Sequence, residues 1–453
     1  TMRLRKTITT IVATAILLAG WQLFAVIANQ PELIPSLPRL VRTLCEWLVS
    51  GSFYQSVGAT ILRGILGMSI SFVCAIGMAG LFARFEWVYE LFRPLLAIMR
   101  SIPVISFILL ALIFLNPESI PLMIAFLTMF PLLTENLTRG ILDLRPGLSI
   151  MARQFHIKRS NVLFQIIYPQ LKPFLYSGLA SAAGFGWRAI IMGEVLSQCA
   201  FGIGSEMKRA QNFIAVPELL AWTIVAVFIS FFFDKGISKV ADITPKISFA
   251  NEDQTIPTPT LSVLDTKDIS YQYGIQHFSH SFQKGIIYGI SAPSGKGKTT
   301  LLNLIGGILL PTEGEIHPTR HFGIATIFQQ PQLLPHLTAE ENIILPLSSF
   351  LTEEKARRIA QKHLQEMEME PFGNRYPKEL SYGQQQRIAI ARALAYPSPL
   401  LLMDEPFKGL DEALSHRIIE RIREMQMKEE RIILFTSHNP DEIRLLADEV
   451  IYL

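Results

Sequence analysis

The chain has 453 residues, enough for two or three ordinary domains. Half of the residues are hydrophobic, only 17% are charged and the mean hydropathy is +0.33, which argues against a chain that is soluble along its whole length. A net charge of +3, spread over the sequence, gives no concentrated basic patch, and we therefore expect no nucleic-acid partner.

Residues 1–241 contain long uncharged apolar runs, and about 20 such residues in a helix cross the hydrocarbon core of a bilayer. The candidate spans are 7–28, 61–83, 95–115, 119–137, 174–198 and 215–233. The alternative, buried helices of a soluble core, is disfavoured because the runs recur. We predict an all-α polytopic membrane domain of about six transmembrane helices, embedded in a lipid bilayer.

Basic residues gather in three segments that fall on one side of the membrane if there are six spans. They are Arg3, Arg5 and Lys6; Arg139, Arg145, Arg153, Lys158, Arg159 and Lys172; and Lys235, Lys239 and Lys246. Because positively charged loops remain on the cytoplasmic side, we expect all three segments to be cytoplasmic.

Short β-branched or aliphatic runs alternate with helical patterns from Val263 onward, at 286–290, 323–328, 400–403 and 432–436. This alternation is typical of an α/β domain with a largely parallel sheet. Residues 242–262 are polar, contain several prolines and have no periodicity, which indicates a linker. The predicted organisation is a membrane domain over 1–241, a linker over 242–262 and an α/β domain over 263–453.

A phosphate-binding loop is predicted at 292–300, between a β-like run and a helical one. A glycine-containing turn that opens a helix directs backbone N–H groups and the helix dipole at phosphate oxygens. In this pattern Lys298 reaches the β- and γ-phosphates, and the Thr299 hydroxyl binds Mg²⁺. Ala292 stands where glycine is usual, and the alternative is a surface turn. The predicted nucleotide-binding residues are Ser294, Gly295, Gly297, Lys298, Thr299 and Thr300.

Two adjacent carboxylates, Asp404 and Glu405, end the apolar run at 400–403. Asp404 is placed to hold Mg²⁺ through water, and Glu405 to polarise the attacking water as a general base. Alone, the pair would be interpreted as a solvated strand end. Downstream of a phosphate-binding loop, it predicts an ATP hydrolase with ATP and Mg²⁺ as cofactors.

Residues 380–384, Leu-Ser-Tyr-Gly-Gln, precede a helical run. The segment resembles the Leu-Ser-Gly-Gly-Gln signature of the ATP-binding cassette (ABC) family, with Tyr382 where glycine is usual. The resemblance implies that Ser381 and Gly383 contact the γ-phosphate of bound ATP and that Gln384 also belongs to the nucleotide-binding residues. The simpler interpretation is a helix start capped by Ser381.

Four further residues match the ABC family in chain order. The resemblance implies that Tyr273 stacks on adenine and that Gln329 contacts Mg²⁺ and the attacking water. It also implies that Asp411 lies at a subunit contact and that His438 hydrogen-bonds the γ-phosphate. In this family the signature of one cassette covers the phosphate-binding loop of another, so the implied partner is a second copy of this chain.

The membrane domain resembles importer permeases that serve nitrate, sulfonate, taurine and thiamine-precursor uptake. The resemblance rests on Leu37-Pro38, the segments 60–64 and 100–103, and Gly193-Glu194. It implies a type I importer of a small polar or anionic solute that a separate extracytoplasmic solute-binding protein delivers. The implied location is the bacterial cytoplasmic membrane, with the ATPase domain in the cytoplasm.

The basic segment over 150–178 is amphipathic and cationic when read as a helix. It resembles the "EAA" coupling loop of ABC importer permeases, which docks on the cassette near Gln329. The alternative is a surface helix lying among lipid headgroups.

Charges inside apolar spans are costly, so they usually face a pathway or each other. Arg188 and Glu194 are predicted either to line the translocation route or to make a static contact between helices. Arg63 and Arg100 lie nearer the span boundaries, where snorkelling to the headgroups is expected.

Three other function classes stay open at this point. A half-size ABC exporter also fuses a membrane domain to a cassette, but the loop over 84–93 is short for its long intracellular helices. A non-transport membrane ABC ATPase would need a larger external domain. A soluble P-loop enzyme with an anchor would need only one or two spans.

Overall fold

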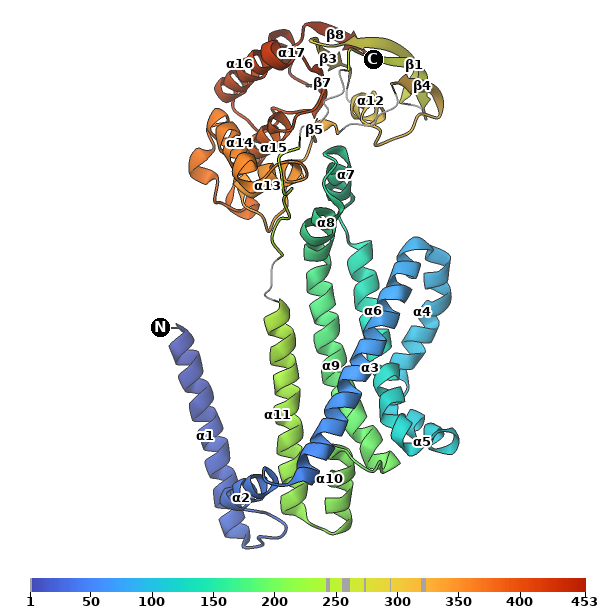
Figure 1. The fold of residues 1–453 in the computed structure, drawn as a ribbon, viewed down its shortest axis with the longest axis vertical. Helices are drawn as coiled ribbons and strands as arrows, with labels where there is room; N and C mark the ends of the chain where they lie inside the picture. The colour runs from blue at the N-terminus through green and yellow to red at the C-terminus, as the bar shows by residue number, and fades with distance from the viewer. Residues whose placement is uncertain (1, 242–244, 255–260, 273, 294, 319–322) are drawn as a thin grey trace. The chain divides into compact units, whose positions relative to one another are not determined.

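The computed structural model describes residues 2–241, 245–254, 261–272, 274–293, 295–318 and 323–453. The chain forms two compact units (Figure 1). Unit 1 comprises Thr1–Leu144 and Gln170–Thr244, and unit 2 comprises Arg145–Pro169 and Pro245–Leu453. The segment 145–169, which interrupts the membrane region in sequence, therefore folds with the C-terminal part of the chain.

Unit 1 is built from helices alone within the described residues, as the apolar runs predict. The helices are α1 (Met2–Ala28), α2 (Leu37–Trp47), α3 (Gly51–Arg84), α4 (Glu86–Ser101), α5 (Val104–Phe114), η1 (Pro117–Ser119), α6 (Ile120–Leu142), α9 (Tyr168–Ser197), α10 (Ile203–Asn212) and α11 (Val216–Ala241). In the described part of the chain, four helical segments are long and apolar enough to cross a membrane, and five if one bent pair counts as a span. A shorter apolar helix covers Val12–Ala28.

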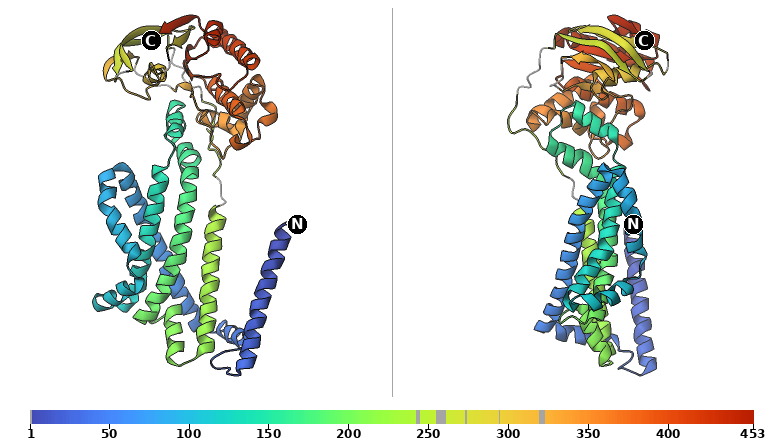
Figure 2. Two further views of the ribbon diagram at one scale, coloured as in Figure 1. Left: turned by 180° about the vertical axis from the view of Figure 1, so that it is seen from behind. Right: turned by 90° about the vertical axis from the view of Figure 1, so that its right-hand side faces the viewer.

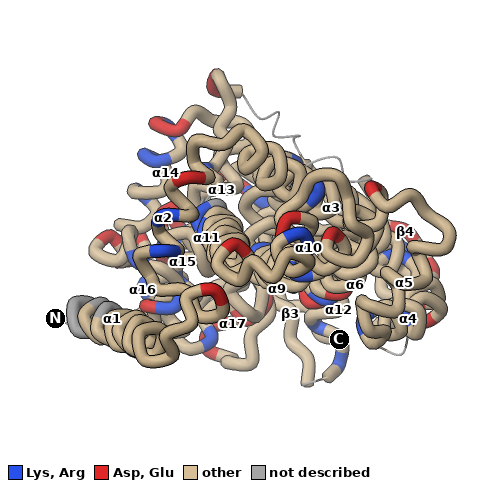
Figure 3. Tube along the Cα trace, turned by 90° about the horizontal axis from the view of Figure 1, so that it is seen from below, with Lys and Arg blue, Asp and Glu red and all other residues tan. Residues whose placement is uncertain are grey.

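The candidate span over 95–115 is divided between two helices. Helices α4 and α5 meet at an angle of 95°. The break lies at Ile102 and Pro103, where Ile102 has an extended backbone (φ −69°, ψ 130°). Proline disfavours a helical conformation in the residue before it and has no N–H of its own, so the helix ends there. Helix α5 has no charged residue along its length (Figure 3).

One hydrophobic cluster of unit 1 forms where α3, α6 and α9 pack together (Figure 2). A Cβ added to Gly67 would lie 2.6 Å from the Cβ of Ala125, so the two backbones approach closely only because Gly67 has no side chain. Ala75 and Ala79 continue the same buried face. Small residues at helix contacts are what packing in a membrane requires.

Unit 2 contains two sheets. The antiparallel sheet has the order β2–β1–β4, and the parallel sheet has the order β5–β6–β7–β3–β8. The strands are β1 (Val263–Tyr271), β2 (Ile275–Gln283), β3 (Ile287–Ser291), β4 (Glu313–His317), β5 (Ala325–Ile327), β6 (Leu400–Asp404), β7 (Ile432–Thr436) and β8 (Glu449–Tyr452). Strands β6 and β7 are buried throughout, which is why they read as unbroken apolar runs. The predicted α/β domain is confirmed.

Helices of unit 2 pack against its parallel sheet and against one another (Figure 1). They are α7 (Pro146–Gln154), α8 (Arg159–Asn161), η2 (Val162–Ile167), α12 (Lys298–Ile305), α13 (Ala339–Leu347), α14 (Glu353–Glu366), η3 (Glu370–Phe372), η4 (Pro377–Glu379), α15 (Tyr382–Ala395), α16 (Glu412–Glu429) and α17 (Pro440–Leu446). Because the strands are parallel, their carboxyl ends meet at one edge of the sheet, where α/β proteins bind ligands.

Candidate nucleotide site

The phosphate-binding loop connects β3 to α12. Gly295 and Gly297 have φ values of +81° and +89°, which favour glycine. A Cβ on Gly297 would also lie 2.7 Å from the carbonyl oxygen of Gly274. Helix α12 begins at Lys298, so its first backbone N–H groups open toward the loop, and Thr299 and Thr300 follow. Ser294 and Tyr273, two of the predicted nucleotide-binding residues, lie outside the described residues.

Lys298 is 7% exposed. Its Nζ donates a hydrogen bond to the Ala292 carbonyl at 2.7 Å and lies 3.5 Å from Nδ1 of His438. The ammonium group is thus held at the mouth of the loop, with His438 beside it. This places two of the residues predicted to contact the triphosphate next to each other.

The predicted Mg²⁺ ligands lie close together. The Thr299 hydroxyl donates to Oδ2 of Asp404 at 2.9 Å, and the Thr436 hydroxyl donates to Oδ1 at 2.8 Å. Burial raises the pKa of Asp404. A pocket of about 260 Å³ is lined by Thr299, Asp404 and Gln329, among other residues. Hydroxyl, carboxylate and amide oxygens are donors that suit Mg²⁺, so the residues present fit this ion.

Glu405 follows directly after β6 with a left-handed backbone (φ 49°), an uncommon conformation for this residue type. Its carboxylate lies 2.9 Å from Nε2 of His438 and 3.3 Å from Nζ of Lys408, and it interacts with the Gln329 side chain. Burial alone would raise the pKa of Glu405. The hydrogen bonds from Gln329 and Lys408, with the neighbouring positive charges, hold that pKa below its ordinary value. Glu405 is therefore an ionised base near neutral pH.

The signature segment forms the start of α15. Ser381 is the N-cap: its hydroxyl accepts from the Gln384 N–H at 3.3 Å, and the Gln384 side chain accepts from the Ser381 N–H at 2.9 Å. A Cβ on Gly383 would lie 2.6 Å from the Gly409 carbonyl oxygen, so only glycine fits there. The capping that the simpler interpretation expects is present. In the described contacts, Ser381, Gly383 and Gln384 do not meet the phosphate-binding loop of their own chain.

Asp411 is the N-cap of α16, and its Oδ1 accepts from the Leu414 N–H at 2.9 Å. This capping bond satisfies one of the free donors at the helix start. The role of Asp411 at a subunit contact stays a prediction.

The coupling segment, residues 145–169, is part of the hydrophobic core of unit 2. Phe155 is fully buried, meets Tyr396 edge-on at 5.2 Å and lies 5.4 Å beneath the Arg392 guanidinium. The Gln154 side chain donates to the Gly306 carbonyl at 2.8 Å. Gly147 lines the same pocket as Gln329. Docking on the cassette therefore describes this segment better than lying among lipid headgroups does.

The two charges predicted inside the α9 span have different surroundings. Glu194 is fully buried and pairs with Arg63 at 2.7 Å, with further hydrogen bonds from Thr60 and the Gly204 N–H. It makes the static interhelix contact that was one of the two expectations. Arg188 is exposed on unit 1 and lines a pocket of about 720 Å³.

Arg63 and Arg100, for which snorkelling was expected, are both ion-paired in unit 1. Arg63 bridges Glu194 and Glu118, each at 2.7 Å, and Arg100 pairs with Glu135. Both guanidinium groups are thus paired with carboxylates of other helices. These carboxylates come within reach only when the helices pack, which the sequence alone does not show.

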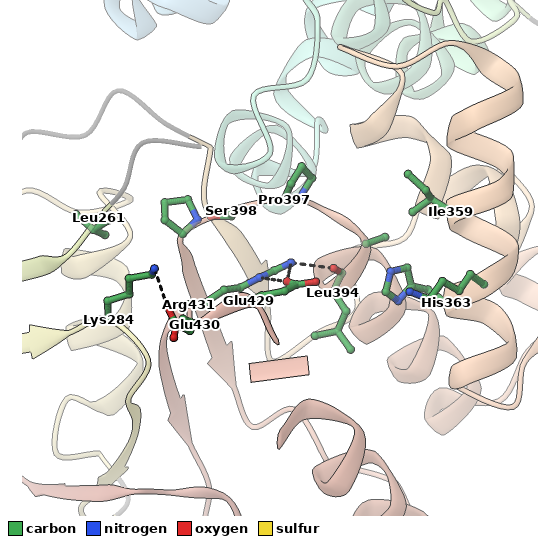
Figure 4. A pocket seen from close by; sticks show the side chains of 13 residues that line it. Leu261, Lys284, Ile359, His363, Leu394, Pro397, Ser398, Glu429, Glu430 and Arg431 are labelled. Atoms are coloured by element: carbon green, nitrogen blue, oxygen red, sulfur yellow. Dashed lines mark hydrogen bonds and ion pairs between the residues drawn. The ribbon is translucent and has the colours of Figure 1, made fainter. Parts of the chain in front are cut away.

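A second pocket of unit 2, of about 480 Å³, has a charged lining (Figure 4). Its ionic groups are already paired: Lys284 with Glu430 at 2.9 Å, and Arg431 with Glu429 at 2.7 Å. None of the described residues predicted to bind nucleotide lines it. The pocket is therefore separate from the nucleotide site.

Two family models match the sequence. Residues 57–234 match "Binding-protein-dependent transport system inner membrane component", and residues 275–408 match "ABC transporter". The thiamine import ATP-binding protein ThiQ of Yersinia pseudotuberculosis is 34% identical over 205 residues, which are 42% of this chain and 86% of ThiQ. The chain belongs to the ABC transporter family.

A second relative of this ABC transporter chain is the Fe(3+) ions import ATP-binding protein FbpC of Rhizobium etli. It is 35% identical over 189 residues, 40% of this chain and 54% of FbpC. The chain thus spans about half the length of this relative. Among solved structures, a dimeric post-hydrolysis ATP-binding cassette bound to ADP and Pi is 32% identical. The match covers 42% of this chain and 94% of that one, with a TM-score of 0.40.

Proposed function

We propose that this ABC transporter chain works as a homodimer that hydrolyses ATP to import a small polar or anionic solute across the bacterial cytoplasmic membrane. The observation that carries the proposal is the joining, in one polypeptide, of an importer-type membrane region to a cassette whose Glu405, Asp404 and Lys298 gather at one sheet edge. Neither the membrane region alone nor the cassette alone would support transport driven by ATP.

The residues of the cassette divide the chemistry between them. When bound, ATP with Mg²⁺ supplies a γ-phosphoryl group that water can attack. Lys298 and the first N–H groups of α12 bind the triphosphate, and Thr299, Asp404 and Gln329 hold the ion. Glu405 accepts the proton of the attacking water at its carboxylate, and His438 holds that carboxylate in place and reaches the γ-phosphate.

A second copy of the chain completes the site in this proposal. Ser381, Gly383 and Gln384 make no described contact with Lys298 or Thr299 of their own chain. The N-terminus of α15, an anion-binding feature, is therefore available to a phosphate held by another cassette. Asp411, which follows the Gly409 turn, would lie at this subunit contact.

The import direction rests on the membrane region, whose family description names a binding-protein-dependent transport system. We infer that an extracytoplasmic solute-binding protein delivers the solute, and that the cassette lies in the cytoplasm. The names of ThiQ and FbpC assign thiamine and Fe(3+) to those relatives. Uptake into proteoliposomes with the purified binding protein tests import. Net efflux without a binding protein would favour the exporter instead.

Replacing the proposed base tests the ATPase. Glu405→Gln keeps the shape of the side chain but removes its basicity, so we expect ATP binding to persist and turnover to fall by about 100-fold or more. The measurements are nucleotide binding and phosphate release by the full chain in detergent or nanodiscs. With ATP, this variant should also accumulate as a cross-linkable dimer.

The matched control is Glu412→Gln, which changes an exposed glutamate in the first turn of α16. We expect it to retain the unmodified rate. Undiminished hydrolysis by Glu405→Gln would contradict the assignment of the base.

A further inference from the structure

Tyr382 departs from the family signature, and its ring has a defined place in the fold. It is the first residue of α15, and its side chain is 42% exposed. A Cβ added to Gly409, which has φ +78°, would lie 2.7 Å from Cδ1 of the Tyr382 ring. The ring therefore lies against the turn that precedes Asp411, and that turn has room for it only because residue 409 is glycine.

The hydroxyl of Tyr382 reaches a different segment. It donates a hydrogen bond of 2.7 Å to the backbone carbonyl of Gln329. Burial raises the pKa of Tyr382, so the phenol stays protonated, and remains a donor, at any pH the protein meets in a cell. Glycine, the usual residue of the signature, has no side chain to make this bond.

A second residue of α15, Arg392, also binds the loop that follows β5. Arg392, which is 1% exposed, donates to the carbonyls of Pro331 at 2.9 Å and Gln332 at 2.8 Å. Burial lowers the pKa of Arg392 to about 9, so the guanidinium still carries its charge at neutral pH. Tyr382 and Arg392 thus fix the two ends of the segment 329–332 to one helix.

The residue held by Tyr382 is the one that touches the proposed base. The Gln329 side chain interacts with Glu405 and lines one pocket with Thr299 and Asp404, while its backbone carbonyl accepts from Tyr382. We propose that Tyr382 is a positioning residue of the ATPase, whose hydroxyl fixes the Gln329 main chain so that the Gln329 side chain stays on Glu405. This inference rests on the proposed function, because it assigns Tyr382 a task in the same hydrolytic site.

A competing explanation is that the ring only covers Gly409. The variant Tyr382→Phe distinguishes the two explanations, because it keeps the ring and removes the hydroxyl. A hydrogen bond contributes roughly 0.5–1.5 kcal/mol. Converted at about 1.4 kcal/mol per tenfold in rate, its loss should lower kcat by about 2- to 10-fold. We expect the KM for ATP to change by less than about twofold, because Tyr382→Phe keeps the ring and leaves Ser381 and Gly383 at the start of α15 unchanged.

A second readout is the Mg²⁺ requirement. Since Gln329 is a proposed ligand of the ion, a displaced Gln329 should raise the Mg²⁺ concentration needed for half-maximal hydrolysis. Loss of ring packing alone would not move that value. The assays use the purified full chain, with Tyr452→Phe as the control, because Tyr452 is 80% exposed on β8.

A double-mutant cycle tests whether Tyr382 acts through Gln329. In a Gln329→Ala background, which keeps the backbone carbonyl but removes the side chain, Tyr382→Phe should cost nothing further. Three outcomes would overturn the proposal: an unchanged kcat for Tyr382→Phe, a loss only for Tyr382→Ala, or full additivity with Gln329→Ala. None of these outcomes affects the Glu405→Gln result, so the failure of this inference and the failure of the ATPase assignment are distinguishable.

Discussion

At the residue scale, the neighbouring carboxylates Asp404 and Glu405 have opposite environments. Asp404 is 8% exposed between two threonine hydroxyls, and burial raises its pKa. Glu405 turns away on a left-handed backbone toward Lys408 and His438, and its pKa is held low. Pairs of titratable groups whose environments separate their pKa values are typical of catalytic sites. The opposite surroundings suit the proposed division of work between an ion ligand and a base.

The partly buried His363 predicts how the stability of unit 2 depends on pH. Burial lowers the pKa of His363 below 6.5, and the charge of Lys362 adds to this, against the opposing effect of Glu366. The unfolded chain therefore binds more protons than the folded chain between the lowered pKa and 6.5, and stability must fall as the pH drops through this window.

We expect His363→Gln to weaken that acid dependence, measured as the melting temperature of the full chain between pH 8 and pH 5. The control is His277→Gln, since the His277 side chain is exposed and its Nδ1 lies 2.9 Å from Oδ1 of Asp268 at the surface. An unaltered pH dependence for His363→Gln would show that other groups govern acid stability.

At the element scale, glycine positions along α3 decide how closely α6 packs. Gly67 faces Ala125 with no room for a side chain, whereas Gly77, on the same helix, has nothing within 4 Å of the position of its Cβ. The apolar pattern of α3 is the same at both positions, and only the packing of unit 1 distinguishes them.

Gly67→Val should therefore destabilise unit 1 by about 1–3 kcal/mol, because the added methyl groups force α3 and α6 apart. The measurement is thermal unfolding in detergent with Gly77→Val as the matched control, which we expect to behave like the unmodified chain. Equal loss of stability in the two variants would contradict the packing argument and indicate a simple cost of valine in this helix.

At the scale of the whole molecule, the coupling segment and the residues after α11 fold together. Asn161 is 1% exposed, donates to the Ser248 carbonyl and the Ser348 hydroxyl, and accepts from the Ser248 N–H, each at 2.8 Å. The Gln165 side chain donates to the Pro245 carbonyl at 2.9 Å. Within the predicted linker, Pro245 and Ser248 are thus bonded to the coupling segment. The domain boundaries stay a prediction, but 145–169 is joined to the cassette.

Asn161→Ala should lower the stability of unit 2, because it removes the hydrogen bonds that join the buried Asn161 side chain to Ser248 and Ser348. The cost is about 1–3 kcal/mol, or roughly 2–10 °C in melting temperature for a domain of this size. Calorimetry of the full chain measures it, with Arg159→Ala at an exposed neighbouring position as the control. If both variants have the melting temperature of the unmodified protein, Asn161 does not hold the coupling segment in place.

The sequence by itself determined the chemistry of the cassette. Residues 292–300, 380–384 and 404–405 are recognisable because their functions depend on neighbours in the chain: glycines that allow a turn, a capping serine, carboxylates that end an apolar strand. If the strands are parallel, their carboxyl ends lie at the same edge of the sheet. The loop after β3, which leads to Thr299, and the end of β6 at Asp404 must then be close together.

Only the tertiary structure decided the pairings between distant segments. The bond from Tyr382 to Gln329, the pairing of Arg63 with Glu194, and the closure of Asn161 on Ser248 each join residues far apart in the chain. Hydrophobic periodicity states which face of an element is buried, but not which residue of another element it meets. The 95° bend after α4 was also decided only by the tertiary structure, because proline ends a helix without setting the direction of the next one.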